Sequence, residues 1–257
     1  MPLDPLSERA FGARADEYER HRAGWPADAV ERGLEGVGAG AESAVVDLAA
    51  GTGKLTRELV TRVARVIAVE PSADMRAQLV AAVPAAEALD GTAESIPLAD
   101  ASVDAVLVGE AFHWFATRAA VAEIARVVRP GGGLALLWNV HDFGDEPWVA
   151  RMGELLTERR APGITPLNRK QTGLWREAFE GSAFGPLEHF ETRHEQRTDV
   201  DGFVAHVATW SFVGALDDEP RAALRRDLAD LVRGEHPSPH DVAIRYRTNV
   251  YWARRRA

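Results

Sequence analysis

The feature that most constrains this fold is an alternation of short apolar runs with helix-like segments over residues 44–140. The runs AVVDLA, VIAVE, VDAVLV and LALLWN are apolar and β-branched, which is typical of strands buried on both faces of a parallel sheet. The segments between them, such as RAAVAEIARVV, repeat apolar residues at helical spacing. This pattern predicts an α/β fold with right-handed crossovers and a ligand site beyond the carboxyl ends of the strands.

The flanking regions show weaker patterns. Residues 7–37 resemble two helices broken at Trp25-Pro26, and residues 143–185 are poorly periodic and rich in Gly, Pro, Trp and Arg. A strand is expected at 187–198, two helices within 199–236, and a strand with one buried face at 242–254. We therefore expect a single domain of 257 residues. Its core is 43–140, and the segments 143–185 and 199–236 are insertions that cap the substrate.

Composition excludes several classes of function. The net charge of −9 disfavours a nucleic-acid partner. The absence of cysteine excludes disulfides, a thiolate nucleophile and a cysteine-ligated metal, and no metal is expected. No apolar run is long enough for a membrane span, and the start MPLDPLSERA lacks the features of a secretory signal, so a cytoplasmic protein is expected. The preference for Arg over Lys suggests a bacterial source.

The glycine-rich turn Asp47-Leu-Ala-Ala-Gly-Thr-Gly53 predicts that a ligand lies directly on the backbone. A phosphate-binding G-x-x-x-x-G-K-[ST] loop is excluded, because positions 48 and 55 are both Leu. A dinucleotide fingerprint from Gly51 needs glycine at position 56, which is Thr, so that interpretation is weakened but stays open. The remaining interpretation is an acid at the end of the strand, followed by a glycine turn that binds no pyrophosphate. In that case Asp47 would face a cationic amino group of the ligand.

Glu70 is the next acid of interest, because it ends the run VIAVE, 19 residues after Gly51. A carboxylate at this place accepts hydrogen bonds from both hydroxyls of a ribose. It supports an adenosine-type ligand without choosing among the cofactors that contain one.

Together these motifs resemble those of the class I S-adenosylmethionine-dependent methyltransferases, in particular the small-molecule branch that includes trans-aconitate methyltransferase-like proteins. VVDLAAGTGKLT is similar to the first motif, with Ala49 in place of its first glycine. VIAVEPSADM resembles the second motif, DGTAESIPLADASVDAVLV the third and fourth, and RVVRPGGGLALLWN the motif in which a Pro-Gly turn precedes the fifth strand.

The resemblance implies a Rossmann-like, seven-stranded, mostly parallel sheet whose last strand is antiparallel, with helices on both faces. It implies S-adenosyl-L-methionine as cofactor, S-adenosyl-L-homocysteine as product, and N-terminal helices that close over the cofactor. The residues implied to bind the cofactor are Tyr18, Arg22, Asp47, Ala49, Gly51, Gly53, Glu70, Pro71, Met75, Ala93, Glu94, Gly109 and Glu110.

Methyl transfer from a sulfonium is a direct displacement, and a general base helps only when the nucleophile carries a proton. His113, in the segment GEAFHWF after the fourth expected strand, is the first candidate for that base; it could instead line the pocket. His141 is the second candidate. The residues expected at the substrate are Trp25, Trp138, Asn139, His141 and Trp210.

We expect transfer to an O, N or C nucleophile of a small molecule, in bacterial metabolism or natural-product biosynthesis, by a monomer or homodimer. No D-P-P-Y-like segment follows the fourth expected strand, which argues against a nucleobase or amide nitrogen as acceptor. Two alternatives remain: a nicotinamide-dependent oxidoreductase on a Rossmann sheet, and a non-catalytic protein that binds the cofactor.

Overall fold

The computed structural model describes residues 20–159 and 172–256, which divide into two compact units. The sheet unit contains residues 24–139, 172–192 and 248–256. The helical unit contains residues 20–23, 140–159 and 193–247. Three long strands, β5, β6 and β7, have residues in both units.

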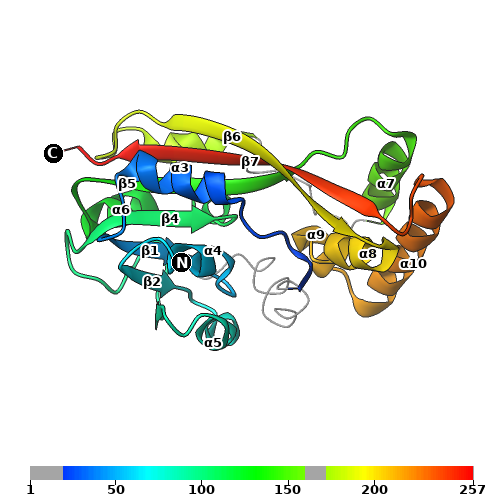
Figure 1. Ribbon diagram of the computed structural model, residues 1–257, viewed down its shortest axis with the longest axis horizontal. Coiled ribbons are helices and arrows are strands. Elements are labelled where there is room, and N and C mark those ends of the chain that lie inside the picture. Colours follow the sequence, from blue (N-terminus) through cyan, green and yellow to red (C-terminus); the bar gives the residue numbers. More distant parts are fainter. Residues whose placement is uncertain (1–19, 160–171, 257) are drawn as a thin grey trace. The chain divides into compact units, whose positions relative to one another are not determined.

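One seven-stranded sheet, in the order β3-β2-β1-β4-β5-β7-β6, organises the chain (Figure 1). Neighbouring strands among the first five are parallel. β7 is antiparallel to β5, since Gly131 N donates to Arg255 O near one end and Asp142 N donates to Arg245 O near the other. The predicted fold class, mostly parallel with an antiparallel last strand, is confirmed. The strands are β1 (Ala44–Leu48), β2 (Arg65–Val69), β3 (Glu87–Leu89), β4 (Val103–Gly109), β5 (Val128–His141), β6 (Glu188–Thr198) and β7 (Val242–Arg254).

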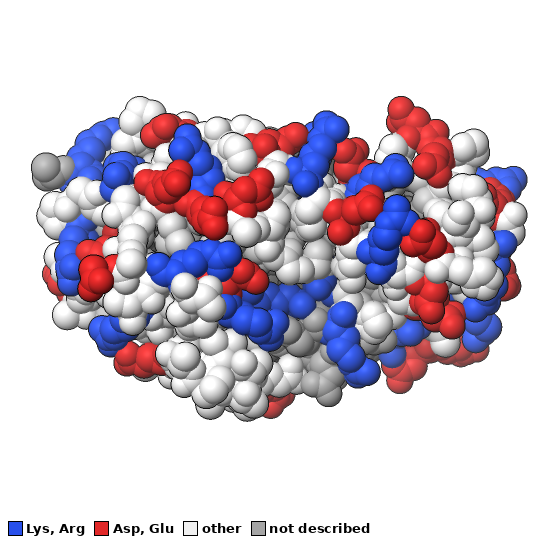
Figure 2. All heavy atoms as spheres, in the orientation of Figure 1, with Lys and Arg blue, Asp and Glu red and all other residues white. Residues whose placement is uncertain are grey.

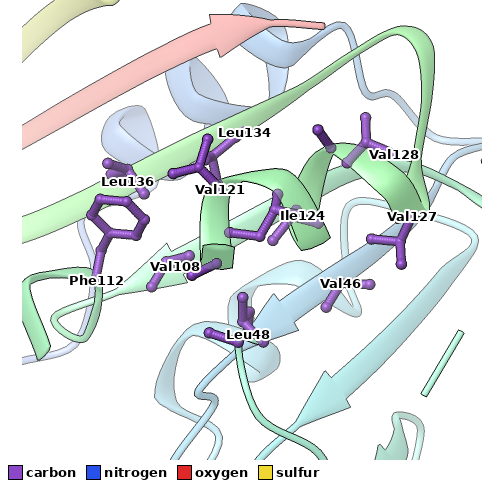
Figure 3. Close-up of a cluster of buried hydrophobic side chains, with 14 of the residues drawn as sticks. Val46, Leu48, Val108, Phe112, Val121, Ile124, Val127, Val128, Leu134 and Leu136 are labelled. Atoms are coloured by element: carbon purple, nitrogen blue, oxygen red, sulfur yellow. The ribbon is translucent and has the colours of Figure 1, made fainter. Parts of the chain in front are cut away.

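Alternate residues of the central strands point to opposite faces of the sheet, so each strand contributes to two apolar layers. On one face Val46, Val108 and Leu136 pack with Ile124 of α6 (Arg118–Val127) (Figure 3). On the other face Val45 and Leu107 belong to a cluster that includes side chains of α3 (Ala27–Val37) and α4 (Lys54–Leu59). The sheet unit also contains α5 (Ala73–Ala82) and the 3-10 helices η2 (Phe112–Trp114) and η3 (Leu174–Phe179). The continuous apolar runs of the sequence are explained by this burial on both sides.

β5 differs from its prediction, because the Pro-Gly segment expected before the strand lies within it. The pairing of β4 with β5 shifts between Val103 and Ala105, which marks an irregularity in the ladder. A Cβ atom on Gly132 would lie 2.1 Å from the carbonyl oxygen of Asp104. Glycine is therefore required here by the close approach of two backbones.

The helical unit consists of α7 (Pro147–Glu158), α8 (Val200–Ala208), α9 (Ser211–Gly214) and α10 (Asp218–Glu235), with the adjoining ends of β5, β6 and β7. The first of the two helices expected within 199–236 is broken after Ala208. At the break the Thr209 hydroxyl donates to the carbonyl of His206 at 2.6 Å, which satisfies one of the last carbonyls of α8. Within the described residues, no helix is both long and apolar enough to cross a membrane.

Candidate functional site

The glycine-rich turn follows β1 and has three residues in the left-handed region: Ala49 (φ 57°), Gly51 (φ 59°) and Gly53 (φ 90°). Gly51 and Gly53 adopt this conformation without a steric cost. Ala49, in the place of the first glycine of the motif, stores about 1 kcal/mol of strain. The turn is tied to β2 by a hydrogen bond from Ala50 N to Val69 O.

Asp47 is buried beneath this turn, with 1% of its surface exposed. Its carboxylate accepts a 2.6 Å hydrogen bond from the hydroxyl of Thr56 in α4. Burial raises the pKa of Asp47 to about 7, although the hydrogen bonds from Thr56 act in the opposite direction. The carboxylate therefore supports the junction of the turn with α4. Its predicted contact with a cationic amino group stays a prediction.

Glu70 stands at the end of β2 and connects two backbone segments. One carboxylate oxygen accepts from Gly51 N and the other from Ser72 N, both at 2.9 Å. Burial raises the pKa of Glu70, and the two N–H donors oppose that shift. The carboxylate is thus held against the glycine turn, where its oxygens are chemically suited to accept from the hydroxyls of a ribose.

The side chains expected near an adenine ring lie on adjacent loops. Met75 is buried, and a Cβ atom on Gly51 would lie 3.9 Å from its sulfur. Pro71 is half-buried between Glu70 and α5. Ala93 is buried and Glu94 half-buried in a loop stabilised by α6, whose Glu123 accepts from Ile96 N at 2.8 Å.

Arg126 of α6 holds the same loop from a second side. Its guanidinium donates to the carbonyl oxygens of Ile96 and Leu98 at 3.0 and 2.8 Å. The same guanidinium pairs with Glu123 and Asp100. The loop that carries Ala93 and Glu94 is therefore fixed in place by its own unit.

The end of β4 forms a polar network with β5 and β7. Glu110 has φ 58°, and its carboxylate accepts from Asn139 N at 2.5 Å. Asn139 donates to Gly24 O at 3.2 Å and accepts from the Thr248 hydroxyl at 2.6 Å. A Cβ atom on Gly109 would lie 2.8 Å from the ring of Trp25, so glycine lets this ring pack on the end of the strand.

His113 lies in η2, and its Nδ1 accepts a 3.3 Å hydrogen bond from Nε1 of Trp138. An acceptor Nδ1 means that a neutral His113 carries its proton on Nε2. The lone pair a base would use is thus already engaged, which favours a lining role for His113 over a catalytic one. Trp138 itself is buried and packs on Trp175, so it has a structural role within its unit.

Arg22, His141 and Trp210 lie in the helical unit. Arg22 donates from Nε to the hydroxyl of Thr209 at 2.8 Å and from Nη2 to its carbonyl at 3.1 Å. His141, the last residue of β5, is half-buried, and its Nε2 lies 2.8 Å from Nε2 of His206. Trp210 donates to the same nitrogen of His206 at 3.3 Å.

The predicted site residues thus fall into two groups. The structure brings Trp25, Trp138, Asn139, His113 and the predicted cofactor residues from Asp47 to Glu110 into the sheet unit, whereas Arg22, His141 and Trp210 belong to the helical unit. Tyr18 lies outside the described residues.

Sequence reasoning missed three residues of these networks: Thr56, His206 and Thr248. Thr56 could have been suspected, because it occupies the position of a fingerprint glycine. The alternation over 242–254 placed Thr248 on the buried face of the last strand, whereas no sequence pattern singled out His206.

Comparison with known proteins identifies the family of this chain. A family model described as a methyltransferase domain matches residues 46–136. An uncharacterized methyltransferase of Schizosaccharomyces pombe is 30% identical over 226 residues, which cover 88% of each chain. An uncharacterized methyltransferase of Mycobacterium tuberculosis is 48% identical over 149 residues, which cover 57% of this chain and 58% of that protein. The chain therefore matches little more than half the length of the mycobacterial relative.

A solved structure with the same fold is that of a protein from Anaeromyxobacter dehalogenans assigned as a type II methyltransferase. It aligns with a TM-score of 0.70 and 24% identity, over 91% of this chain and 97% of that one. At this identity the likeness concerns the fold.

Proposed function

Since the chain belongs to the class I S-adenosylmethionine-dependent methyltransferase family, we propose that it transfers the methyl group of S-adenosyl-L-methionine to a small molecule. The observation that carries the proposal is the carboxylate of Glu70, which is held against the glycine turn by Gly51 N at 2.9 Å. A carboxylate that can accept hydrogen bonds from a ribose therefore lies beside the glycine turn at the carboxyl ends of β1 and β2. This is the expected place for an adenosine-type ligand.

The residues of this region fit the cofactor by their chemistry. Glu70 would accept from the ribose hydroxyls, and Met75, Ala93 and Glu94 would contact the adenine ring. At Gly51 a Cβ atom would have no neighbour nearer than 3.9 Å, so this glycine leaves the backbone of the turn open to close approach. When bound, the cofactor supplies an activated methyl group on a sulfonium. The protein therefore has to bind the cofactor and the acceptor, orient them toward each other, and exclude water.

The narrower parts of the proposal concern the acceptor and its setting. A small molecule is favoured over a nucleic acid, because acidic and basic side chains are interspersed on the face shown in Figure 2 and the net charge is −9. The substrate roles of Trp25, Trp138, Asn139, His141 and Trp210 are proposals from the sequence. A cytoplasmic location, a role in bacterial metabolism and a monomeric or dimeric state are proposals from the sequence, as is the resemblance to the trans-aconitate branch.

Calorimetric titration tests the cofactor directly. We expect S-adenosyl-L-homocysteine to bind the unmodified chain and NADH to give no heat. Glu70→Gln keeps one acceptor oxygen for the backbone and should weaken binding of S-adenosyl-L-homocysteine by about 1–3 kcal/mol, because a charged acceptor of the ribose hydroxyls is lost. The matched control Glu188→Gln changes an exposed acid of β6 and should leave the affinity unchanged.

Two results would contradict the proposal. Heat with NADH but none with S-adenosyl-L-homocysteine would favour the oxidoreductase. Equal affinity of Glu70→Gln and the unmodified chain would remove Glu70 from the ribose site. Incorporation of labelled methyl groups from S-adenosyl-L-methionine into a metabolite extract would distinguish an enzyme from a cofactor-binding protein without activity.

A further inference from the structure

The sheet unit contains a buried amide that contacts three segments distant in the sequence. Asn139 of β5 has 7% of its surface exposed. Its Nδ2 donates to Gly24 O at 3.2 Å, and its Oδ1 accepts from the hydroxyl of Thr248 at 2.6 Å. Its backbone N donates to the carboxylate of Glu110 at 2.5 Å. Asn139 thus connects the segment before α3, the end of β4 and the middle of β7.

These partners fix the orientation of the amide. The carbonyl oxygen of Gly24 only accepts, so the atom that faces it is the amide nitrogen. The amide oxygen then faces the hydroxyl of Thr248, which is completely buried and needs an acceptor. A donor and an acceptor are both required of the side chain at position 139, and an apolar side chain of similar size supplies neither.

The hydrogen bond to Gly24 holds the next residue, Trp25, over the end of β4. A Cβ atom on Gly109 would lie 2.8 Å from the ring of Trp25 and 3.3 Å from the side chain of Leu55. Leu55 lies in the first turn of α4, whose N-terminal cap is Gly53 of the glycine turn. The ring of Trp25 and the beginning of α4 therefore lie over the same strand end, beside the glycine turn.

The end of β4 is itself held by β5. Glu110 has φ 58°, in the left-handed region, so the chain bends directly after Gly109. Glu110 N donates to Leu137 O at 2.9 Å, and its carboxylate accepts from Asn139 N. The surface on which Trp25 packs is thereby fixed by the same residue that holds Gly24.

We propose that Asn139 is a positioning residue that holds Trp25 on the end of β4, where the ring forms one wall of the cofactor site. This inference rests on the cofactor binding proposed above. It gives Trp25 and Asn139 roles at the cofactor that differ from the substrate contacts predicted from the sequence. The amide of Asn139 acts on the backbone of the chain itself, and Trp25 is the group that faces the ligand.

Fluorine NMR of the full chain labelled with fluorinated tryptophan tests the contact without any ligand. The chain has seven tryptophans, and the resonance lost in Trp25→Phe is that of Trp25. Asn139→Leu removes both amide bonds and should move this resonance toward that of an exposed ring. Thr248→Val removes one of them and should move it less. Asn249→Leu is the matched control, because Asn249 accepts from or donates to His189 in the same unit, and it should leave the resonance in place.

Calorimetric titration with S-adenosyl-L-homocysteine connects the contact to the cofactor. Trp25→Ala should weaken binding about tenfold, because an apolar wall is lost. Asn139→Leu should weaken it by a similar factor. Since both changes act through the same ring, the double variant should bind within about twofold of Trp25→Ala alone.

Four results would overturn the inference. They are an unmoved Trp25 resonance in folded Asn139→Leu, unchanged affinity in Trp25→Ala, unchanged affinity in folded Asn139→Leu, and factors that multiply to about 100-fold in the double variant. The last result would mean that Asn139 acts independently of Trp25. If Asn139→Leu does not fold, an unmoved resonance in Thr248→Val overturns the inference in its place. Absence of S-adenosyl-L-homocysteine binding to the unmodified chain would contradict the proposed function and the cofactor wall with it, whereas the fluorine spectrum judges the contact between Asn139 and Trp25 separately.

Discussion

Asp47 shows that a single buried carboxylate can be costly to the fold. Its carboxylate is almost completely buried, and Thr56 provides a hydroxyl and a backbone N–H for it. These donors do not compensate fully for the loss of water, since the pKa rises to about 7. Between about pH 4 and pH 7 the folded chain therefore holds a proton that the unfolded chain has released, and stability falls as the pH rises through this window.

Asp47→Asn should remove this dependence. Each unit of pKa difference corresponds to about 1.4 kcal/mol, so from about pH 5 to pH 8 the unmodified chain should lose about 3 kcal/mol of unfolding free energy that the variant keeps. Urea unfolding at the two pH values measures this difference. Asp90→Asn changes an exposed carboxylate and is the control. Equal pH slopes for Asp47→Asn and the unmodified chain would show that Asp47 ionises normally in the fold.

The contrast between Glu70 and His206 shows what residue-level reasoning from the sequence can predict. Glu70 was found because it follows a strand and a glycine turn at a fixed spacing, and its bond to Gly51 N agrees with that interpretation. His206 lies in a helix that begins 59 residues after β5 ends, so its approach to His141 depends on the fold of the helical unit. A local sequence pattern contains no information about contacts between residues that are so far apart in the chain.

β5 shows how one element can combine regular pairing with an irregular beginning. Its residues from Gly133 to Leu137 pair in register with β4, whereas the preceding Pro-Gly segment accommodates a shift. The sequence pattern predicted a strand at the apolar run LALLWN, but it did not predict that the strand begins at Val128. Propensity rules exclude Pro and Gly from strand interiors, and here the tertiary contact with Asp104 overrides them.

Gly132→Ala should destabilise this element. The new Cβ atom would lie 2.1 Å from the backbone oxygen of Asp104, which no side-chain rotation relieves. We expect a loss of about 1–3 kcal/mol in the free energy of unfolding by urea, the range typical of overpacked sites.

Gly153→Ala is the matched control, because it lies inside α7 with nothing within 4 Å of its Cβ position. Alanine is the better helix former, so this variant should gain about 0.5–1 kcal/mol. The two substitutions add the same methyl group and should have opposite signs. An unchanged free energy of unfolding in Gly132→Ala would mean that β4 and β5 can move apart at little cost.

For the whole molecule, the sequence predicted the sheet unit much better than the helical unit. Residues 44–140 alternate between two periodicities that correspond to buried strands and covering helices, and each helix follows its strand by a short connection. In the helical unit the amphipathic segments could be recognised, but their mutual packing could not, because it joins pieces from 140–159 and 193–247. The residues proposed to bind the cofactor therefore lie in the unit whose fold the sequence predicted, whereas the contacts within the helical unit were not accessible to sequence reasoning.

Acid stability of the whole chain should depend on the helical unit through His206. Burial lowers its folded pKa to about 3, whereas an unfolded histidine has its ordinary value of about 6.5. Below about pH 6.5 the unfolded chain binds a proton that the folded chain excludes, so stability is lost as the pH falls through this window. From pH 7 to about pH 5 this one group should cost about 2 kcal/mol.

His206→Gln should make the chain less sensitive to acid, because glutamine does not titrate. Urea unfolding at pH 7 and at about pH 5 should show a drop that is smaller by about 2 kcal/mol in this variant than in the unmodified chain. His240→Gln, which changes an exposed histidine, should keep the full drop. Because Asp47 contributes the opposite slope, the comparison has to be made between chains that retain Asp47, so that its term cancels. An equal drop in His206→Gln and the unmodified chain would mean that His206 titrates normally in the folded protein.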